Sequence, residues 1–332
     1  MRLLILLLVS LPAYSQYAKY FLHTPASGKV VSGPHTDKAV LIDVSSADLR
    51  TTLDGGLVES TSGYDIVPHS DAACTTAITA HLRISYSSNG SVGRWRGLVE
   101  AASLSSSTNV YMCFANSSVS TDQTNPSQVC SADHVAYYGF GDGTTLDLTD
   151  WCGALNLTNT GTVTASTDAK IYGAAGTNWS GSVYLERADG TELDSITAGI
   201  TICAWVKPSS FAAYRGIIAK LNADASVRAF EMDTEITTGK LRGMVTIGGV
   251  LKVATSTNGL STSAYNHACF TYDGANVQTY LNGVADGSPT AATGTMDTTN
   301  VKMTIGALYS SSGSTEFAGV IDDIQLIKAA KP

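Results

Sequence analysis

Charged residues are scarce in this sequence. Of 332 residues, 14% are Asp, Glu, Lys or Arg, and the formal net charge is -8. The chain therefore lacks a basic surface that would neutralise a phosphate backbone, and no nucleic-acid partner is expected. Amphipathic helical patterns are also missing, while Ser, Thr, Gly and Asn dominate the polar residues. This composition suits exposed strands and turns.

The sequence also lacks the short motifs of common enzyme classes. It contains no GxSxG, no HExxH and no Walker sequence, and none of its six cysteines lies in a CxxC pair. The GFGDG segment at 139–143 lacks the GxGxxG spacing, and we interpret it as a turn between domains. A structural zinc site, a thioredoxin-type redox motif and a nucleotide loop are therefore disfavoured.

Only the N-terminus carries a long apolar run, from Leu3 to Leu11 after Met1-Arg2. Small residues follow at Ala13 and Ser15, so we predict a secretory signal peptide at residues 1–15. The run is too short to span a bilayer as a mature helix. We expect a secreted or cell-surface protein with no membrane span after cleavage. The remaining chain is longer than one hydrophobic core usually serves, which predicts two domains.

The first half of the mature chain consists of short alternating segments separated by turn signals. Examples are KAVLIDVSS at 38–46, ITAHLRISYS at 78–87 and RWRGLVEA at 94–101. Such spacing is typical of an antiparallel β-sandwich. We therefore predict a β-sandwich domain over residues 16–135.

Three segments of this half carry a resemblance. In order, they are KAVLIDVSSADLRTTLDGG, GYDIVPHSD and STNVYMCFANSSVSTDQTNPS. Together they resemble an uncharacterised bacterial surface domain that commonly precedes laminin-G-like domains and has no established activity. Where that family has an aromatic residue and a glycine, this chain has Cys113 and Ala115. The departures indicate that Cys113 forms a disulfide, with Cys74 as its partner.

Two segments of the second half alternate with period two. In ITICAWVKP, Ile202 and Ala204 face one way while Cys203 and Trp205 face the other. In HACFTYDG, Cys269 likewise lies on the side away from the more apolar set. Two such strands lying side by side can carry a cross-strand disulfide.

These segments belong to a longer resemblance, over roughly Asp150 to Lys328. In order, its parts are ITICAWVKP, GIIAKL, NHACFTYDGANVQTYLNG, MTIGAL and FAGVIDDIQLI. They are similar to the laminin-G-like and pentraxin group of concanavalin A-like jelly rolls. The resemblance implies an all-β protein whose residues 136–332 form such a jelly roll after the first β-sandwich. It also implies a Cys203–Cys269 disulfide, because pentraxins join the matching strands in this way.

The last two cysteines, Cys130 and Cys152, bracket the segment between the predicted domains. A disulfide between them would covalently cross-link the connection between the two domains.

One acidic strand is a candidate catalytic element. Glu231, Asp233 and Glu235 alternate and so share one face of a strand. They resemble the ExDxE strand of a retaining glycosidase family on the jelly-roll scaffold, which implies Glu231 as nucleophile and Glu235 as acid/base. The favoured interpretation is a solvated acidic face, because the four tryptophans are dispersed and indicate no aromatic cleft.

Ligand and metal candidates are few. Trp205 lies on the strand face opposite the aliphatic side and can cover the apolar face of a sugar, although packing beneath a loop is the favoured interpretation. Asp322 and Asp323 are candidate calcium ligands, since calcium prefers oxygen donors. No other cofactor is expected.

The expected function is non-enzymatic binding or adhesion outside the cell. The partner would be a glycan or a surface protein, with carbohydrate as the first choice; this step rests on fold-level analogy. Two alternatives remain open. One is a retaining glycosidase using Glu231, Asp233 and Glu235, and the other is a structural component of a surface assembly.

Overall fold

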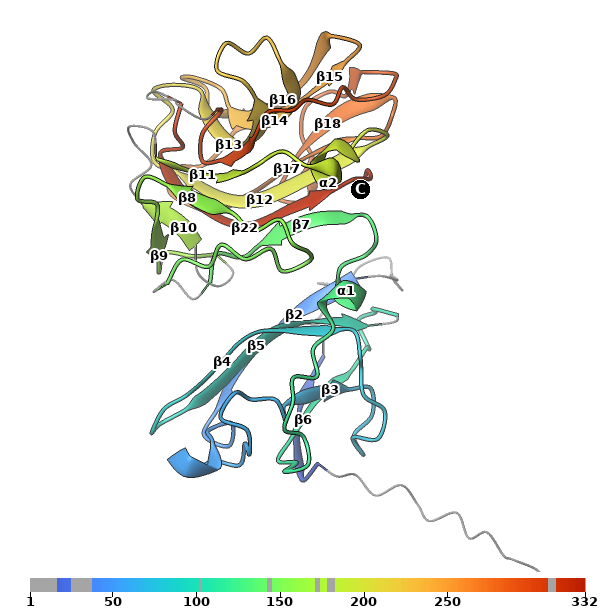
Figure 1. Ribbon diagram of the computed structural model, residues 1–332, viewed down its shortest axis with the longest axis vertical. Helices are drawn as coiled ribbons and strands as arrows, with labels where there is room; N and C mark the ends of the chain where they lie inside the picture. The colour runs from blue at the N-terminus through green and yellow to red at the C-terminus, as the bar shows by residue number, and fades with distance from the viewer. Residues whose placement is uncertain are drawn as a thin grey trace, which may run out of the picture. The chain divides into compact units, whose positions relative to one another are not determined.

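The computed structural model describes residues 17–24, 38–101, 103–141, 145–170, 174–177, 183–309 and 315–331. It divides into two compact units, one ending at Ser131 and one beginning at Ala132 (Figure 1). The predicted signal peptide at 1–15 and part of the GFGDG turn lie outside the described residues. Within those residues, no helix has the length and apolar character needed to cross a membrane.

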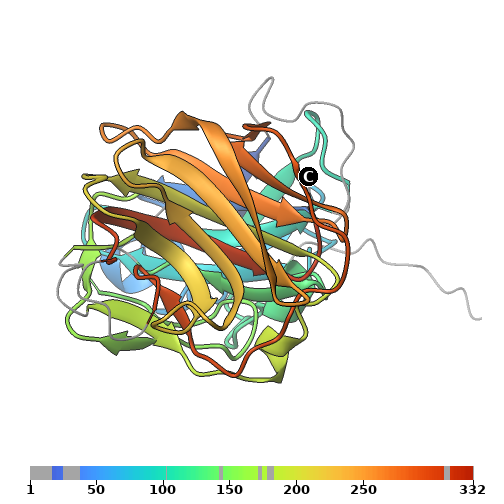
Figure 2. The same cartoon turned by 90° about the horizontal axis from the view of Figure 1, so that it is seen from above.

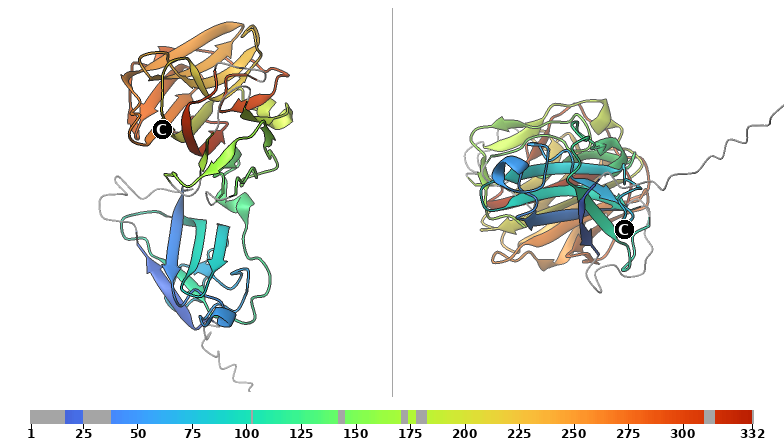
Figure 3. Two further views of the ribbon diagram at one scale, coloured as in Figure 1. Left: turned by 90° about the vertical axis from the view of Figure 1, so that its left-hand side faces the viewer. Right: turned by 90° about the horizontal axis from the view of Figure 1, so that it is seen from below.

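The N-terminal unit contains two small antiparallel sheets in its described part (Figure 3). One has the order β1-β6-β3 and the other β2-β5-β4. The elements are β1 (Lys19–His23), β2 (Lys38–Ser46), η1 (Thr52–Asp54), β3 (Val67–His69), β4 (His81–Ser88), β5 (Gly93–Ala101), β6 (Val110–Phe114) and α1 (Pro126–Val129). Their core contains the fully buried side chains of Trp95, Val99, Met112 and Phe114.

Strand β4 begins later than the sequence pattern predicts. The N–H of Ile78 bonds the carbonyl of Pro68 at 2.8 Å, so the chain before His81 runs along β3 instead. A register shift between Arg83 and Ser85 then interrupts the alternation within β4.

The C-terminal unit is a β-sandwich of two larger antiparallel sheets in the described residues. The larger sheet has the order β19-β18-β17-β12-β22-β10-β9, with β20 beside β18 and β7 beside β22. The smaller has the order β16-β15-β14-β13-β21-β11-β8. The elements are β7 (His134–Tyr138), β8 (Thr158–Thr160), β9 (Thr164–Ser166), β10 (Ala174–Thr177), β11 (Tyr184–Arg187), α2 (Thr191–Asp194), β12 (Ile200–Pro208), β13 (Arg215–Leu221), β14 (Arg228–Thr234), β15 (Lys240–Ile247), β16 (Val250–Gly259), β17 (Asn266–Tyr272), β18 (Asn276–Leu281), β19 (Val284–Ala285), β20 (Thr290–Ala291), β21 (Met303–Ile305) and β22 (Gly319–Ile327).

Alternating side chains of both sheets meet in one core. Ile202 and Phe270 come from the larger sheet, and Phe230 and Met232 come from the smaller. Gly243 of β15 allows this close approach, because a Cβ there would lie 2.4 Å from Cβ of Phe270. Figure 2 shows the long, curved strands of this unit from above. The predicted all-β fold class is confirmed.

A lysine lies at one end of this core. Lys220 of β13 is fully buried, and its ammonium contacts carboxylates of Asp189 at 2.7 Å and Asp194 at 3.2 Å. It also donates to the hydroxyl of Thr299 at 3.2 Å and to the carbonyl of that residue. A buried charge requires such compensation. The lysine thereby connects the segment around α2 to the loop before β21.

Candidate functional site

The acidic strand is β14, which lies between β15 and β13 in the smaller sheet (Figure 1). Because side chains alternate along a strand, Phe230 and Met232 enter the core while Glu231 and Asp233 point to the outer face. Both acids are nevertheless buried, with exposed fractions of 1% and 0%.

Two arginines explain this burial. Arg242 lies opposite Asp233 in the β14–β15 register and donates to it from Nε at 2.8 Å and from a second guanidinium nitrogen. Its guanidinium also lies 4.3 Å from the ring centroid of Tyr214. Arg228 Nε lies 2.8 Å from Oε2 of Glu231. The bidentate pair is the stronger of the two contacts.

Burial raises the pKa of Glu231 to about 8, and the adjacent Asp233 carboxylate adds to the rise. Burial also raises the pKa of Asp233, but the hydrogen bonds from Arg242 oppose that effect. The pair therefore holds a proton near neutral pH, and we place it on Glu231.

The interpretation of this strand as a solvated acidic face is wrong for Glu231 and Asp233. Arg242 compensates the carboxylate of Asp233, and the proton that we place on Glu231 lets the strand bury the second acid. Glu235 is half-buried and accepts a hydrogen bond from the hydroxyl of Thr238 at 2.6 Å. The three acids thus lie in unlike surroundings, and their predicted catalytic role stays a prediction.

Trp205 lies on the outer face of the larger sheet. It pairs with His267 across β12 and β17, and the two ring centroids lie 4.8 Å apart. The ammonium of Lys170 lies 5.0 Å from the centroid of the Trp205 ring. Trp205 is therefore half-buried between two neighbours, and its role in ligand binding stays a prediction.

Two of the predicted cysteine pairs are disulfides in the structure. Cys203 and Cys269 face each other in the β12–β17 register, with Cα atoms 4.2 Å apart. Cys74 and Cys113, with Cα atoms 6.1 Å apart, join the loop after β3 to β6. Cys130 and Cys152 are disulfide-bonded too, and their pairing as a link between the domains stays a prediction.

Removing the Cys203–Cys269 bond is expected to destabilise the fold. It closes a loop over 66 positions, for which chain-entropy estimates give roughly 4 kcal/mol of stabilisation. A Cys203→Ala, Cys269→Ala double variant should therefore unfold at lower urea concentration than the oxidised wild type. Unchanged unfolding would contradict the estimate.

Cys203, His267 and Cys269 also place donor atoms within 4.8 Å of one another. Both sulfurs are bonded to each other, so this group offers no thiolate to a metal in the oxidised protein.

The two candidate calcium ligands have structural partners. Asp322 is fully buried and accepts the backbone N–H of Lys170 at 2.8 Å. Asp323 has a left-handed φ of 54° at a register shift in β22 and accepts the hydroxyl of Tyr137 at 2.5 Å. Burial raises the pKa of Asp323 to about 6, against the effect of this hydrogen bond. Calcium binding here stays a prediction.

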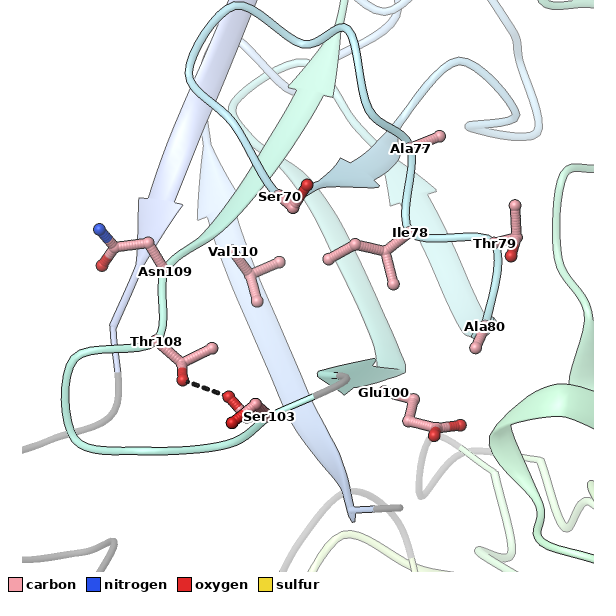
Figure 4. Close-up of a pocket in the computed structure, with 10 residues that line it drawn as sticks. All are labelled: Ser70, Ala77, Ile78, Thr79, Ala80, Glu100, Ser103, Thr108, Asn109 and Val110. Carbon is pink, nitrogen blue, oxygen red and sulfur yellow. Dashed lines mark hydrogen bonds between the residues drawn. The ribbon is translucent and has the colours of Figure 1, made fainter. Parts of the chain in front are cut away.

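The N-terminal unit contains a pocket of about 510 Å³. Ile78 and Val110 point toward one another in it, and Thr108 donates to the carbonyl of Ser103 at 2.8 Å (Figure 4). Among the described residues that line this pocket, Glu100 is the one with an ionisable side chain.

A smaller pocket of about 220 Å³ lies in the C-terminal unit. We name it the Arg228 pocket; its lining includes Val227, Arg228, Thr246, Leu251, Asp297 and Thr299. Sequence reasoning missed this pocket, and it missed Arg228 and Arg242. The signal for Arg242 was the turn at Thr237-Thr238-Gly239, which sets the register that places Arg242 opposite Asp233.

The fold and one family model agree on the class of the C-terminal unit. Residues 177–331 match a model described as the concanavalin A-like lectin/glucanases superfamily. This part of the chain is a concanavalin A-like, laminin-G-like β-sandwich. The match begins after β7, although β7 pairs with β22 in the same sheet. The predicted identity of the N-terminal domain stays a prediction.

No curated protein matches the chain. Among solved structures, domain 4 of AbnA, an extracellular arabinanase from Geobacillus stearothermophilus in complex with arabinotriose, is 20% identical. That match covers 60% of this chain and 94% of that one, with a TM-score of 0.48.

The botulinum neurotoxin serotype G binding domain is 14% identical, over 60% of this chain and 48% of its own, with a TM-score of 0.46. A SAP-like pentraxin from Limulus polyphemus is 18% identical. The match covers 41% of this chain and 66% of the pentraxin chain, with a TM-score of 0.30. The chain thus spans about half the length of the toxin domain.

Proposed function

We propose that this protein is an extracellular, non-enzymatic binding protein whose C-terminal unit binds carbohydrate. The observation that carries the proposal is the concanavalin A-like sandwich in which Arg242 compensates Asp233 and Glu231 is buried. A retaining glycosidase needs two carboxyl groups that reach the sugar from opposite sides. Glu231 is buried and protonated near neutral pH, and its carboxyl group lies against Arg228, so it does not favour that chemistry.

Cysteine usage supports the extracellular location. All six cysteines lie in the described residues, and all are disulfide-bonded. The sequence also contains the predicted signal peptide at residues 1–15. Disulfides persist mainly in oxidising compartments.

A glycan array with the full mature chain tests the proposal. We expect binding to a subset of glycans and no release of reducing sugar from the polysaccharides that contain them. Reduced and alkylated protein that circular dichroism shows to be unfolded is the control, because it lacks the folded sheets.

Two results would contradict this proposal. Binding to no glycan would exclude carbohydrate as the ligand. Adhesion to protein or a structural role would then remain as the candidate functions. Hydrolysis by the wild type that is lost in Glu231→Gln and Glu235→Gln variants would establish the glycosidase instead.

A further inference from the structure

The Arg228 pocket is built from three separate turns of the C-terminal sandwich. Val227 lies in the β13–β14 turn, Gly249 in the β15–β16 turn, and Asp297 in the loop before β21. Hydrogen bonds fix the β15–β16 turn to the loop before β21. Asp297 donates its N–H to the carbonyl of Thr246 at 2.8 Å, and its carboxylate accepts the N–H groups of Gly248 and Gly249 at 2.8 and 2.7 Å.

The third turn has a second support. Thr299 in the same loop holds the buried ammonium of Lys220, which in turn contacts Asp189 and Asp194. The pocket wall is therefore attached to the core rather than carried by a free loop. A preformed wall lowers the ordering cost of binding a small ligand.

The polar lining offers both kinds of hydrogen-bonding group. Arg228 can only donate and the Asp297 carboxylate can only accept, while the hydroxyls of Thr246, Thr298 and Thr299 can do either. The Nε of Arg228 lies 2.8 Å from Oε2 of Glu231. Neighbouring sugar hydroxyls require this combination, because each one donates one hydrogen bond and accepts others.

Apolar side chains border the same pocket. Val227 and Leu251 line it and are 37% and 40% exposed. Together they give the pocket an apolar border beside its polar groups. The C–H face of a sugar ring is a suitable partner for them.

The size of the pocket limits the ligand. Its volume of about 220 Å³ is below the roughly 300 to 1,000 Å³ of sites for drug-sized ligands. It therefore suits one ring that enters end-on, rather than several consecutive units of a chain.

We propose that the Arg228 pocket binds one terminal, neutral sugar ring of a glycan, with Arg228 donating to and Asp297 accepting from adjacent hydroxyls. This inference rests on the proposed function, since it names the subsite and the ligand chemistry within it.

The test uses the full mature chain and three single-ring probes: methyl α-mannoside, methyl α-glucoside and methyl β-galactoside. We expect one of them to compete with the best glycan of the array. Leu251→Asp should weaken that binding at least about tenfold, since it replaces apolar contact area with a charge. Val284→Asp is the matched control, because Val284 is 69% exposed on β19 and does not line the pocket; its binding should equal that of the wild type.

Other outcomes would overturn the inference and leave the proposed function intact. One is affinity that rises steeply with chain length while single rings do not compete. Another is stronger competition by a methyl glucuronide than by the neutral probes. A third is unchanged binding by Leu251→Asp together with loss of binding by Trp205→Ala, which would place the site on the other sheet. A wild type that binds no glycan overturns both proposals.

Discussion

Replacing Arg242 with alanine is expected to lower the free energy of unfolding by about 3 to 5 kcal/mol near pH 7. The substitution leaves the carboxyl group of Asp233 fully buried without its bidentate partner. It also removes the guanidinium that lies over the ring of Tyr214. Urea denaturation of the two proteins measures the difference.

Lys302→Ala is the matched control. Lys302 forms a 2.8 Å ion pair with Glu186 in the same unit, but half of its side chain is exposed. Exposed pairs contribute about 0 to 1 kcal/mol. An Arg242→Ala variant that loses no more stability than Lys302→Ala would show that Asp233 does not depend on its partner. Adding Asp233→Asn to Arg242→Ala should restore part of the loss, because the amide carries no charge.

The second large effect is expected from Glu231→Gln, as a change in how stability depends on pH. In the folded state the pKa of Glu231 is about 8, whereas the ordinary value of 4.5 applies to the unfolded chain. Between these values the folded protein keeps a proton that the unfolded chain has lost. Raising the pH through this window therefore favours unfolding, by at most about 1.4 kcal/mol for each pH unit.

Glutamine has no proton to lose, so the variant should escape this effect. We expect its stability, relative to wild type, to rise from pH 5 to pH 8 and to equal or exceed it at the upper end. Urea denaturation across that range gives the difference curve. Asp323 and the histidines titrate in both proteins, and their effects cancel in the difference. A difference that does not change with pH would refute the assignment of the proton to Glu231.

The sequence predicts local strand geometry well in this chain. Alternation in ITICAWVKP and HACFTYDG places Cys203 and Cys269 on the same face of the sheet, because side chains alternate along a strand with a period of two. The same rule places Glu231 and Asp233 on one face of β14. It could not predict that this face is buried, since burial depends on what the neighbouring strand contributes.

Long-range placement is the part that local pattern does not contain. The contact between Arg242 and Asp233 can be predicted only when the hairpin register is known. The Arg228 pocket forms only when three turns that are separate in the sequence come together. In the same way, Ile78 continues an apolar alternation but bonds Pro68 rather than joining β4. In each case a contact with a distant segment decides between conformations that the local sequence allows equally.

Lys220 holds two segments of the C-terminal unit together through a charge that belongs to the chain itself. Oxygen atoms from Asp189, Asp194 and Thr299 surround one positive charge, as they would surround a metal ion. A metal ion occupies such a position only as far as its concentration permits, whereas an ammonium on the chain is present in every folded molecule. The ammonium thus offsets one of the two carboxylate charges at the junction between the α2 segment and the loop before β21 without an ion from the medium.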